Sequence, residues 1–152
     1  MGRPRKEGMD YFPHDVDASQ DEKIEAMRSM FGNDGYAFYF IILERIYRSE
    51  HAELDLSKDV YAVALANKIM VTKQRFDEMI YTSVDLGLFD ADTFFQHQRL
   101  TSKVVKKRFD EINLIRNKWR NIKQDKGLSF LNGKQGGKLV EKGVEKPIKE
   151  SK

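Results

Sequence analysis

The sequence predicts a mainly α-helical domain with a small β-hairpin, followed by a long C-terminal helix. Apolar residues recur at helical spacing in several segments of the 152-residue chain, and turn-forming residues separate these segments. The composition, with 40% hydrophobic and 11% aromatic residues, is sufficient for one buried core. We therefore expect one folded domain over residues 9–109, preceded by a basic arm at 1–8.

The first expected elements are an extended segment and a helix. Residues 9–17 alternate apolar and polar side chains around one proline, which favours an extended segment along the domain edge. Ser19 and Glu22 have the spacing of a capping box, and apolar residues follow at helical intervals. Gly32 is expected to end this helix, because glycine readily adopts the left-handed conformation beyond a helix terminus.

A central helix and a third, shorter helix are expected next. Residues 33–35 have turn chemistry, and residues 36–47 are apolar nearly all round, which predicts a buried helix. Residues 53–56 alternate like a short strand, and Ser57 is placed to cap the third helix. Along one face of that helix lie Val60, Val63, Ala64 and Asn67.

A fourth helix and a hairpin complete the domain. Thr72 is placed to cap the fourth helix and Gly87 to follow its end, so the third and fourth helices have the outline of a helix-turn-helix. Residues 88–90 and 98–100 are expected to pair as two short strands, which is the pattern of a wing. The alternative is a helical turn at 93–96. The fold class is therefore a winged helix-turn-helix domain.

A long basic amphipathic helix is expected over residues 101–126, opened by Thr101 or Ser102. It carries an apolar stripe with partial heptad spacing, formed by Val105, Ile112, Ile115, Trp119 and Ile122. The stripe predicts self-association or docking on the domain. Stacking of Trp119 on an unpaired base is the less favoured alternative. Residues 127–152 are rich in glycine and lysine and are expected to form a flexible tail.

The residue types exclude several classes of function. The chain has no cysteine, so disulfides and thiolate chemistry are absent, and its three histidines lack the spacing of a zinc site. No glycine-rich phosphate loop and no nucleophile with an evident base occurs. We expect no catalysis, no cofactor, no metal and no small-molecule substrate. Because no apolar run approaches the roughly 18 residues of a membrane span and no secretory signal begins the chain, we expect a cytoplasmic protein without membrane partners.

Charge is distributed unevenly along the chain. The formal net charge of +3 divides into +2 over residues 1–8, −9 over 9–98, +7 over 99–126 and +3 over 127–152. Exposed charges act over about one Debye length, roughly 8 Å in cells. DNA, if it binds, is therefore expected to bind locally, at the arm, the last helix or the tail.

The strongest candidates for DNA binding cluster where the expected wing meets the last helix. Their positive charges would neutralise phosphates, although a solvated helix face is the alternative. These residues are Arg99, Lys103, Lys106, Lys107 and Arg108.

Two weaker sets of candidates lie elsewhere. The start of the fourth helix is where recognition helices present side chains to base edges, although Asp77 and Glu78 weaken that interpretation. Arg3 and Arg5 in the arm are candidates for a minor groove, or belong to a disordered basic start. The candidates near the fourth helix are Lys68, Lys73, Gln74 and Arg75.

Several stretches of the chain also carry a family resemblance. They read RPRKEGMDYFPHDVD, KIEAMRSMFGNDGYAFYFIILERIYR, GLFD and LTS, in that order. In identity and order they resemble the N-terminal domain of phage replisome organisers, which is similar to DnaD-type replication-initiation proteins of Gram-positive bacteria. The resemblance covers residues 3–109. It implies a winged-helix fold, contacts with DNA, self-association and a role in loading the replication machinery at an origin.

This chain departs from the family pattern in two respects. Met70 stands where relatives tend to have glycine in the turn before the fourth helix, so a differently shaped turn is expected. Initiators of this type often carry a further C-terminal domain, and here only the tail follows.

We therefore expect a DNA-binding, self-associating module of a phage or prophage replication-initiation protein, acting in the bacterial host cell. Its expected partners are DNA, replisome or helicase-loading proteins and further copies of itself. Two alternatives stay open: a winged-helix transcription regulator that reads a palindromic site, and an interaction scaffold without DNA binding.

Overall fold

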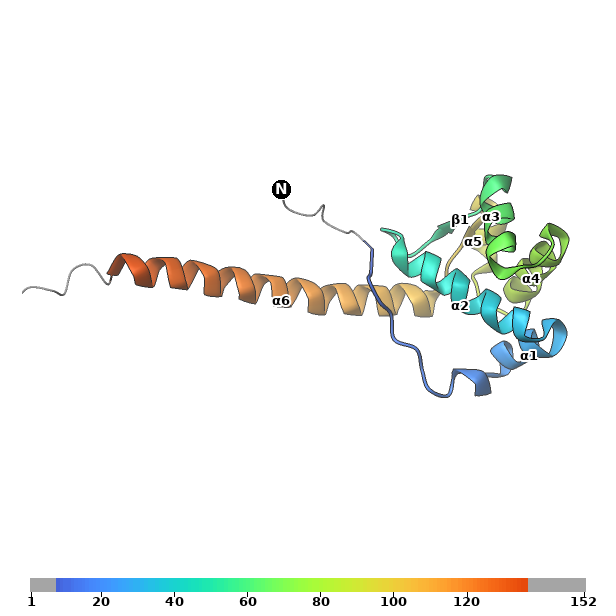
Figure 1. Ribbon diagram of the computed structural model, residues 1–152, viewed down its shortest axis with the longest axis horizontal. Helices are drawn as coiled ribbons and strands as arrows, with labels where there is room; N and C mark the ends of the chain where they lie inside the picture. Colours follow the sequence, from blue (N-terminus) through green and yellow to red (C-terminus); the bar gives the residue numbers. More distant parts are fainter. Residues whose placement is uncertain (1–7, 137–152) are drawn as a thin grey trace, which may run out of the picture. The chain divides into compact units, whose positions relative to one another are not determined.

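The computed structural model describes residues 8–136, with side chains up to Lys126. The chain divides into two compact units, Met1–Asp110 and Glu111–Lys152. Arg3 and Arg5 lie outside the described residues, as does the part of the expected tail beyond residue 136. The elements, shown in Figure 1, are a 3-10 turn at Ala18–Gln20, then α1 (Glu22–Phe31), α2 (Asn33–Arg48), β1 (Leu54–Asp55), α3 (Asp59–Ile69), α4 (Lys73–Asp85), α5 (Ala91–His97), β2 (Arg99–Leu100) and α6 (Lys103–Gly136).

Residues 9–17 form an extended segment, here called the N-terminal strap, that runs along α2 (Figure 1). The backbone N–H of Met9 donates to the carbonyl of Tyr47 at 2.9 Å. The ring of Phe12 stacks on Tyr47, with centroids 4.8 Å apart, and the ring of His14 stacks on Phe40 at 4.2 Å. The expected extended segment is confirmed, and aromatic stacking holds it in place.

The start of α1 differs from the prediction. Asp21, not Ser19, is the N-cap, and its carboxylate accepts from the backbone N–H groups of Lys23 and Ile24 at 3.0 and 3.2 Å. Ser19 lies in the preceding 3-10 turn. An aspartate caps as well as a serine does, and its negative charge also suits the positive helix N-terminus, so the spacing alone pointed to the wrong residue.

Gly32 ends α1 with a φ of 66°, as predicted, but α2 begins at once with Asn33. The turn expected at residues 33–35 is therefore wrong. Gly35 lies inside the helix and is buried, and a Cβ atom there would lie 2.4 Å from the carbonyl oxygen of Met27. This glycine allows α1 and α2 to approach closely instead of forming a turn.

The core is built around α2, as predicted. Phe38, Ile42 and Ile46 are fully buried on this helix. The ring of Phe38 meets Phe76 of α4 edge to face at 5.6 Å. Other buried residues come from α1, α3, α4 and α6, so helices from both ends of the first unit share one core.

Helix α3 buries a different face from the one that its sequence pattern indicates. The face that the sequence pattern indicated, with Val60, Val63, Ala64 and Asn67, is exposed. Small and aliphatic residues on the opposite face are buried, and small side chains let neighbouring helices approach closely. Ser57 does not cap the helix, since the N-cap is Lys58. The buried residues of α3 are Ala62, Leu65, Ala66 and Ile69.

A tight turn joins α3 to α4. Met70 adopts the left-handed conformation, with φ 65° and ψ 38°, which closes α3 as a glycine would. The hydroxyl of Thr72 then accepts from the N–H of Arg75 at 3.2 Å, so the predicted cap of α4 is confirmed. Gly87, with a φ of 72°, follows the end of α4 as expected.

The expected β-hairpin is not formed. β2 pairs antiparallel with β1, with Leu54 opposite Leu100, and the segment between the two predicted strands is helix α5. Asp90 explains the helix, because its carboxylate accepts from both the N–H and the hydroxyl of Thr93. The N–H of Asp90 donates to the carbonyl of Thr101 at 2.8 Å, one residue beyond the second predicted strand.

Ser102 opens α6 by accepting from the N–H of Val105 at 3.1 Å. Thr101 is buried, and its hydroxyl donates to the carbonyl of Ala52 at 2.7 Å. Helix α6 continues to Gly136, so residues 127–136, which were expected to belong to a flexible tail, are helical. Among residues 8–136, no helix is both long and apolar enough to cross a membrane.

Candidate nucleic-acid interface

The fold gathers five cations on β2 and the first turns of α6, in the first unit. We call these residues, Arg99, Lys103, Lys106, Lys107 and Arg108, the basic patch. Their closeness in sequence places them in adjacent turns, as predicted. The carboxylates that accept from Arg99, Lys106 and Arg108 come from distant parts of the chain.

Glu53 holds two cations of the patch in position. Its carboxylate accepts from Nζ of Lys106 at 2.7 Å and from the guanidinium of Arg99 at 3.2 Å. The hydrogen bond from Lys106 is the main cause of the lowered pKa of Glu53. The Glu53 side chain is only 20% exposed, whereas those of Lys106 and Arg99 are 47% and 51% exposed. The two cations are therefore oriented by a partly buried anchor and still reach solvent.

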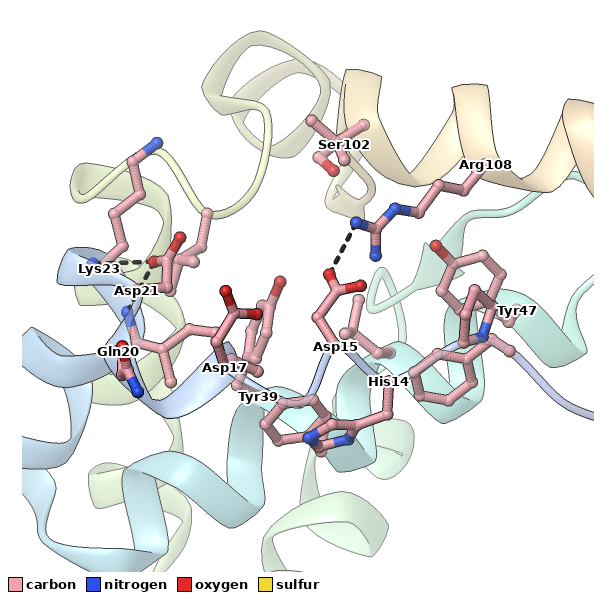
Figure 2. Close-up of a pocket in the computed structure, with 18 of the residues that line it drawn as sticks. His14, Asp15, Asp17, Gln20, Asp21, Lys23, Tyr39, Tyr47, Ser102 and Arg108 are labelled. Carbon is pink, nitrogen blue, oxygen red and sulfur yellow. Dashed lines mark hydrogen bonds and ion pairs between the residues drawn. The ribbon is translucent and has the colours of Figure 1, made fainter.

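Asp15 of the N-terminal strap accepts from the guanidinium of Arg108 at 2.8 Å, as Figure 2 shows. Tyr39 and Tyr47 line the same hollow, and burial raises the pKa of Tyr39 to about 12. The hydrogen bond to Asp15 raises the pKa of Arg108. Arg108 thus ties the strap to α6 across 93 residues of sequence, a contact that no local pattern could reveal.

The hollow beneath the strap has a volume of about 520 Å³. Asp15, Asp17 and Asp21 line it together with Lys23 and Arg108, so charges of both signs surround it (Figure 2). The Lys23 ammonium donates to the carbonyl of Gly87 at 3.1 Å. The hollow thus lies where the strap, α1 and the end of α4 meet. Because its lining carries both positive and negative charges, it does not favour a ligand of either charge.

The two remaining lysines of the patch are exposed. Lys103 lies at the start of α6 near Asp90, whose pKa is lowered chiefly by its hydrogen bonds to Thr93 and, to a smaller extent, by this lysine. Lys107 lies one turn further along. Together with Arg99, Lys106 and Arg108, these lysines concentrate positive charge on β2 and the first turns of α6.

The candidates at the start of α4 are engaged within the domain. The ammonium of Lys73 lies 2.6 Å from Asp77 and 3.0 Å from Asp59, and the hydrogen bond to Asp77 is the main cause of its raised pKa. The Arg75 guanidinium donates to the carbonyl of Phe31 at 3.0 Å and also lies over the Phe31 ring.

Two other candidates lie nearby. The amide of Gln74 donates to Glu78 at 3.3 Å. Lys68, in the last turn of α3, is exposed. The structure thus brings Lys68, Lys73, Gln74 and Arg75 together around one turn, but intramolecular partners occupy three of the four.

The expected apolar stripe divides between the two units. Val105 is buried in the core of the first unit, so it is not available for self-association. In the second unit Ile115 and Trp119 are exposed, while Ile112 and Ile122 are half-buried. Leu114 is also exposed and was not included in the prediction. The accessible stripe therefore starts at Ile112.

Metal ligation has no support in the described part of the chain. No three His, Asp or Glu side chains of residues 8–136 gather closely enough to hold an ion. The acidic residues near the patch act as ion-pair partners of lysine and arginine.

The fold and the basic patch define a class, a mainly helical domain with a two-stranded antiparallel sheet and a long basic C-terminal helix. The chain belongs to the Lin1244/Lin1753-like N-terminal family, whose model matches residues 11–105. It is 31% identical over 109 residues to the uncharacterized phage-related protein Lin1244/Lin1753 of Listeria innocua serovar 6a, an alignment that covers 72% of this chain and 35% of the relative. The chain thus spans about a third of that relative's length. No solved structure matches the chain at a significant level.

Proposed function

We propose that this chain is the DNA-binding and self-associating N-terminal module of a phage or prophage replication-initiation protein, working in the cytoplasm of the bacterial host. The observation that carries the proposal is the basic patch, in which Glu53 orients Arg99 and Lys106 toward solvent. Cations that are held in place lose less conformational entropy when they bind phosphates. The phage-related relative supports the phage origin, and the sequence resemblance to replisome organisers is the reason for proposing the replication role.

The proposed contacts are to the DNA backbone, not to base edges. Lys73 and Arg75, the cations best placed on α4 for base readout, are engaged by Asp77 and by the carbonyl of Phe31. Phosphate contacts position a protein on DNA but carry no sequence information. This distinguishes the proposal from a transcription regulator, which requires a specific site.

The proposed module acts by binding and turns over no substrate. Its partners are DNA, further copies of itself, and replisome or helicase-loading proteins. The exposed residues Ile115 and Trp119 in the second unit supply an apolar surface for self-association. A module that binds backbone phosphates and multiplies its contacts by association gains affinity without base specificity.

The test is fluorescence anisotropy with labelled duplex and single-stranded DNA across a salt series. Neutralising about five phosphates predicts a log-log slope near −4.5 on duplex DNA, or roughly 500-fold weaker binding between 50 and 200 mM salt. In the double variant Lys103→Ala, Lys106→Ala, we expect the slope to become about two units shallower and binding to weaken equally on all sequences. Arg108 is left intact because it holds the strap.

A second double variant, Lys58→Ala, Lys68→Ala, removes the same charge beside α3. Unchanged binding by this variant is expected. If it loses as much affinity as the first, the interface lies on α3 and α4 instead of the basic patch. No binding by the unmodified chain at 50 mM salt would contradict the proposal and favour an interaction scaffold.

A further inference from the structure

Helix α3 carries a second apolar face that the domain does not cover. Its inward face packs through Ala62, Leu65 and Ala66, yet Val60 is 64% exposed on the other side, and Val63, Ala64 and Tyr61 are also exposed. Scattered single apolar residues are ordinary on a protein surface, but several on one face of one helix indicate a contact surface. The apolar residues Val60, Val63 and Ala64, which the sequence pattern placed along one face of the helix, belong to this exposed surface.

Beside this face lies a groove between the end of α2, β1 and α3, here called the α3 groove. Its volume is about 420 Å³. Leu54, Tyr61, Ala64 and Leu65 provide its apolar lining, and Tyr61 and Ala64 also belong to the exposed face of α3. The groove and the face therefore form one continuous surface.

Two arginines of α2 line the α3 groove without an ion-pair partner in the described part of the chain. The Nε atom of Arg45 is buried and has no hydrogen-bond acceptor. Arg48 is exposed at the end of α2. Buried donors in folded proteins are nearly always satisfied, and an unsatisfied one costs free energy until an acceptor arrives.

The carboxylates that line the groove are already engaged. Glu53 accepts from Lys106 and Arg99, and Asp55 accepts from the backbone N–H of Ser57 at 2.8 Å. Lys58 lies over the ring of Tyr61, 5.9 Å from its centroid, and adds another cation at the border. The surface therefore combines apolar contacts with two guanidinium groups, those of Arg45 and Arg48, that form no ion pair within the described residues.

We propose that the α3 groove binds an acidic amphipathic segment of a partner protein. Apolar side chains of the segment contact Tyr61, Ala64 and Leu65, and its carboxylates accept from Arg45 and Arg48. Charge complementarity selects this occupant, and the apolar lining favours a peptide over a nucleic acid, whose backbone offers anions without apolar side chains. The proposal does not depend on DNA binding by the basic patch.

The experiment begins with a display library of random peptides selected on the full chain. Enriched peptides are synthesised with a fluorophore, and their affinity is measured by anisotropy. We expect them to combine apolar residues with Asp or Glu. The variant Ala64→Glu places bulk and negative charge on the groove wall and should weaken binding at least about tenfold. The variant Arg48→Glu should also weaken binding, and peptides with Lys in place of Glu should recover it.

Matched variants elsewhere serve as controls. Ala91→Glu alters another exposed helical alanine, on α5, and Arg28→Glu reverses another exposed arginine, on α1. Both should bind the peptides as the unmodified chain does. Thermal unfolding followed by circular dichroism establishes that Ala64→Glu is folded, and Arg48→Glu provides the second test if it is not.

Several outcomes would overturn the proposal. They are the absence of enriched peptides, enriched peptides without acidic residues, and peptides that bind Ala64→Glu with undiminished affinity. If Ala64→Glu instead lowers the oligomeric state in light scattering, the occupant is a second copy. If it weakens duplex DNA binding as much as Lys103→Ala, Lys106→Ala does, the occupant is nucleic acid. Loss of peptide binding in Arg48→Glu with duplex DNA binding retained separates the two proposals.

Discussion

At the scale of single residues, Met70 adopts the left-handed conformation that favours glycine. A left-handed conformation costs a non-glycine residue roughly 1–2 kcal/mol, and Met70 is 91% exposed, so little burial offsets the cost. Glycine loses about 0.5–1 kcal/mol more conformational entropy on folding. We expect Met70→Gly to raise the free energy of unfolding by about 0.5–1 kcal/mol, measured by urea titration.

The matched control for Met70→Gly is Asn67→Gly, one turn earlier on the exposed side of α3. A glycine in the helix interior should destabilise the domain by about 0.5 kcal/mol, because helical conformation restricts it more than asparagine. Opposite signs for the two substitutions would show that the backbone conformation of residue 70 decides the effect. A lower free energy of unfolding for Met70→Gly would contradict this account.

Glu53 predicts a pH dependence at the same scale. Its pKa is lowered in the folded protein, chiefly by the hydrogen bond from Lys106, so its stabilising contribution is present above the unfolded pKa of about 4.3 and is lost as the pH falls through the folded value. We expect Glu53→Gln to lower the free energy of unfolding by up to about 1 kcal/mol at pH 7. The difference from the unmodified chain should shrink below about pH 4.

Urea titrations at several pH values measure this difference. Glu44→Gln is the control, since Glu44 is exposed on α2 and forms no ion pair within the described residues. An equal, pH-independent effect of Glu53→Gln and Glu44→Gln would show that the contacts of Glu53 with Lys106 and Arg99 contribute nothing to stability.

At the scale of elements, the helices were predictable, but the buried face of α3 was not. The all-round apolar run of α2, the Thr72 cap and Gly87 are local signals, and the structure has them where predicted. Helix α3 has apolar residues on two faces, so periodicity could not choose between them. Residues 91–97 were ambiguous in the same way between a hairpin loop and a helix. The Asp90 cap favours helix α5, and β2 pairs with β1 instead of with residues 88–90.

The same distinction holds for the basic patch. Its cations are close in sequence, so their clustering followed from the start of one helix. Glu53 and Asp15, which orient three of them, lie 46–53 and 93 residues away and belong to no motif. The ion pairs of Lys73 and Arg75 with Asp59 and Asp34 likewise depend on tertiary packing. Sequence patterns therefore located the candidate cations, and only the fold showed which groups they contact.

At the scale of the whole molecule, the proposed self-association rests on the second unit. Trp119 is 62% exposed on a helix where Ile115 and Leu114 are exposed as well. Exposed aromatic and aliphatic side chains at this density are costly in water and gain free energy when a second helix covers them. We expect the full chain to form oligomers in light scattering, and Trp119→Ala to lower the mean mass at equal concentration.

The control for Trp119→Ala is Lys118→Ala, which changes the neighbouring exposed residue and should leave the mass unchanged. Because several bound copies would add their phosphate contacts, Trp119→Ala should also weaken binding to long duplex DNA more than binding to a duplex that accommodates one copy. Equal weakening on both lengths would place Trp119 in direct contact with DNA. A monomer before and after the substitution would mean that the exposed stripe does not associate copies of this chain, and that any cooperation on DNA comes from other partners.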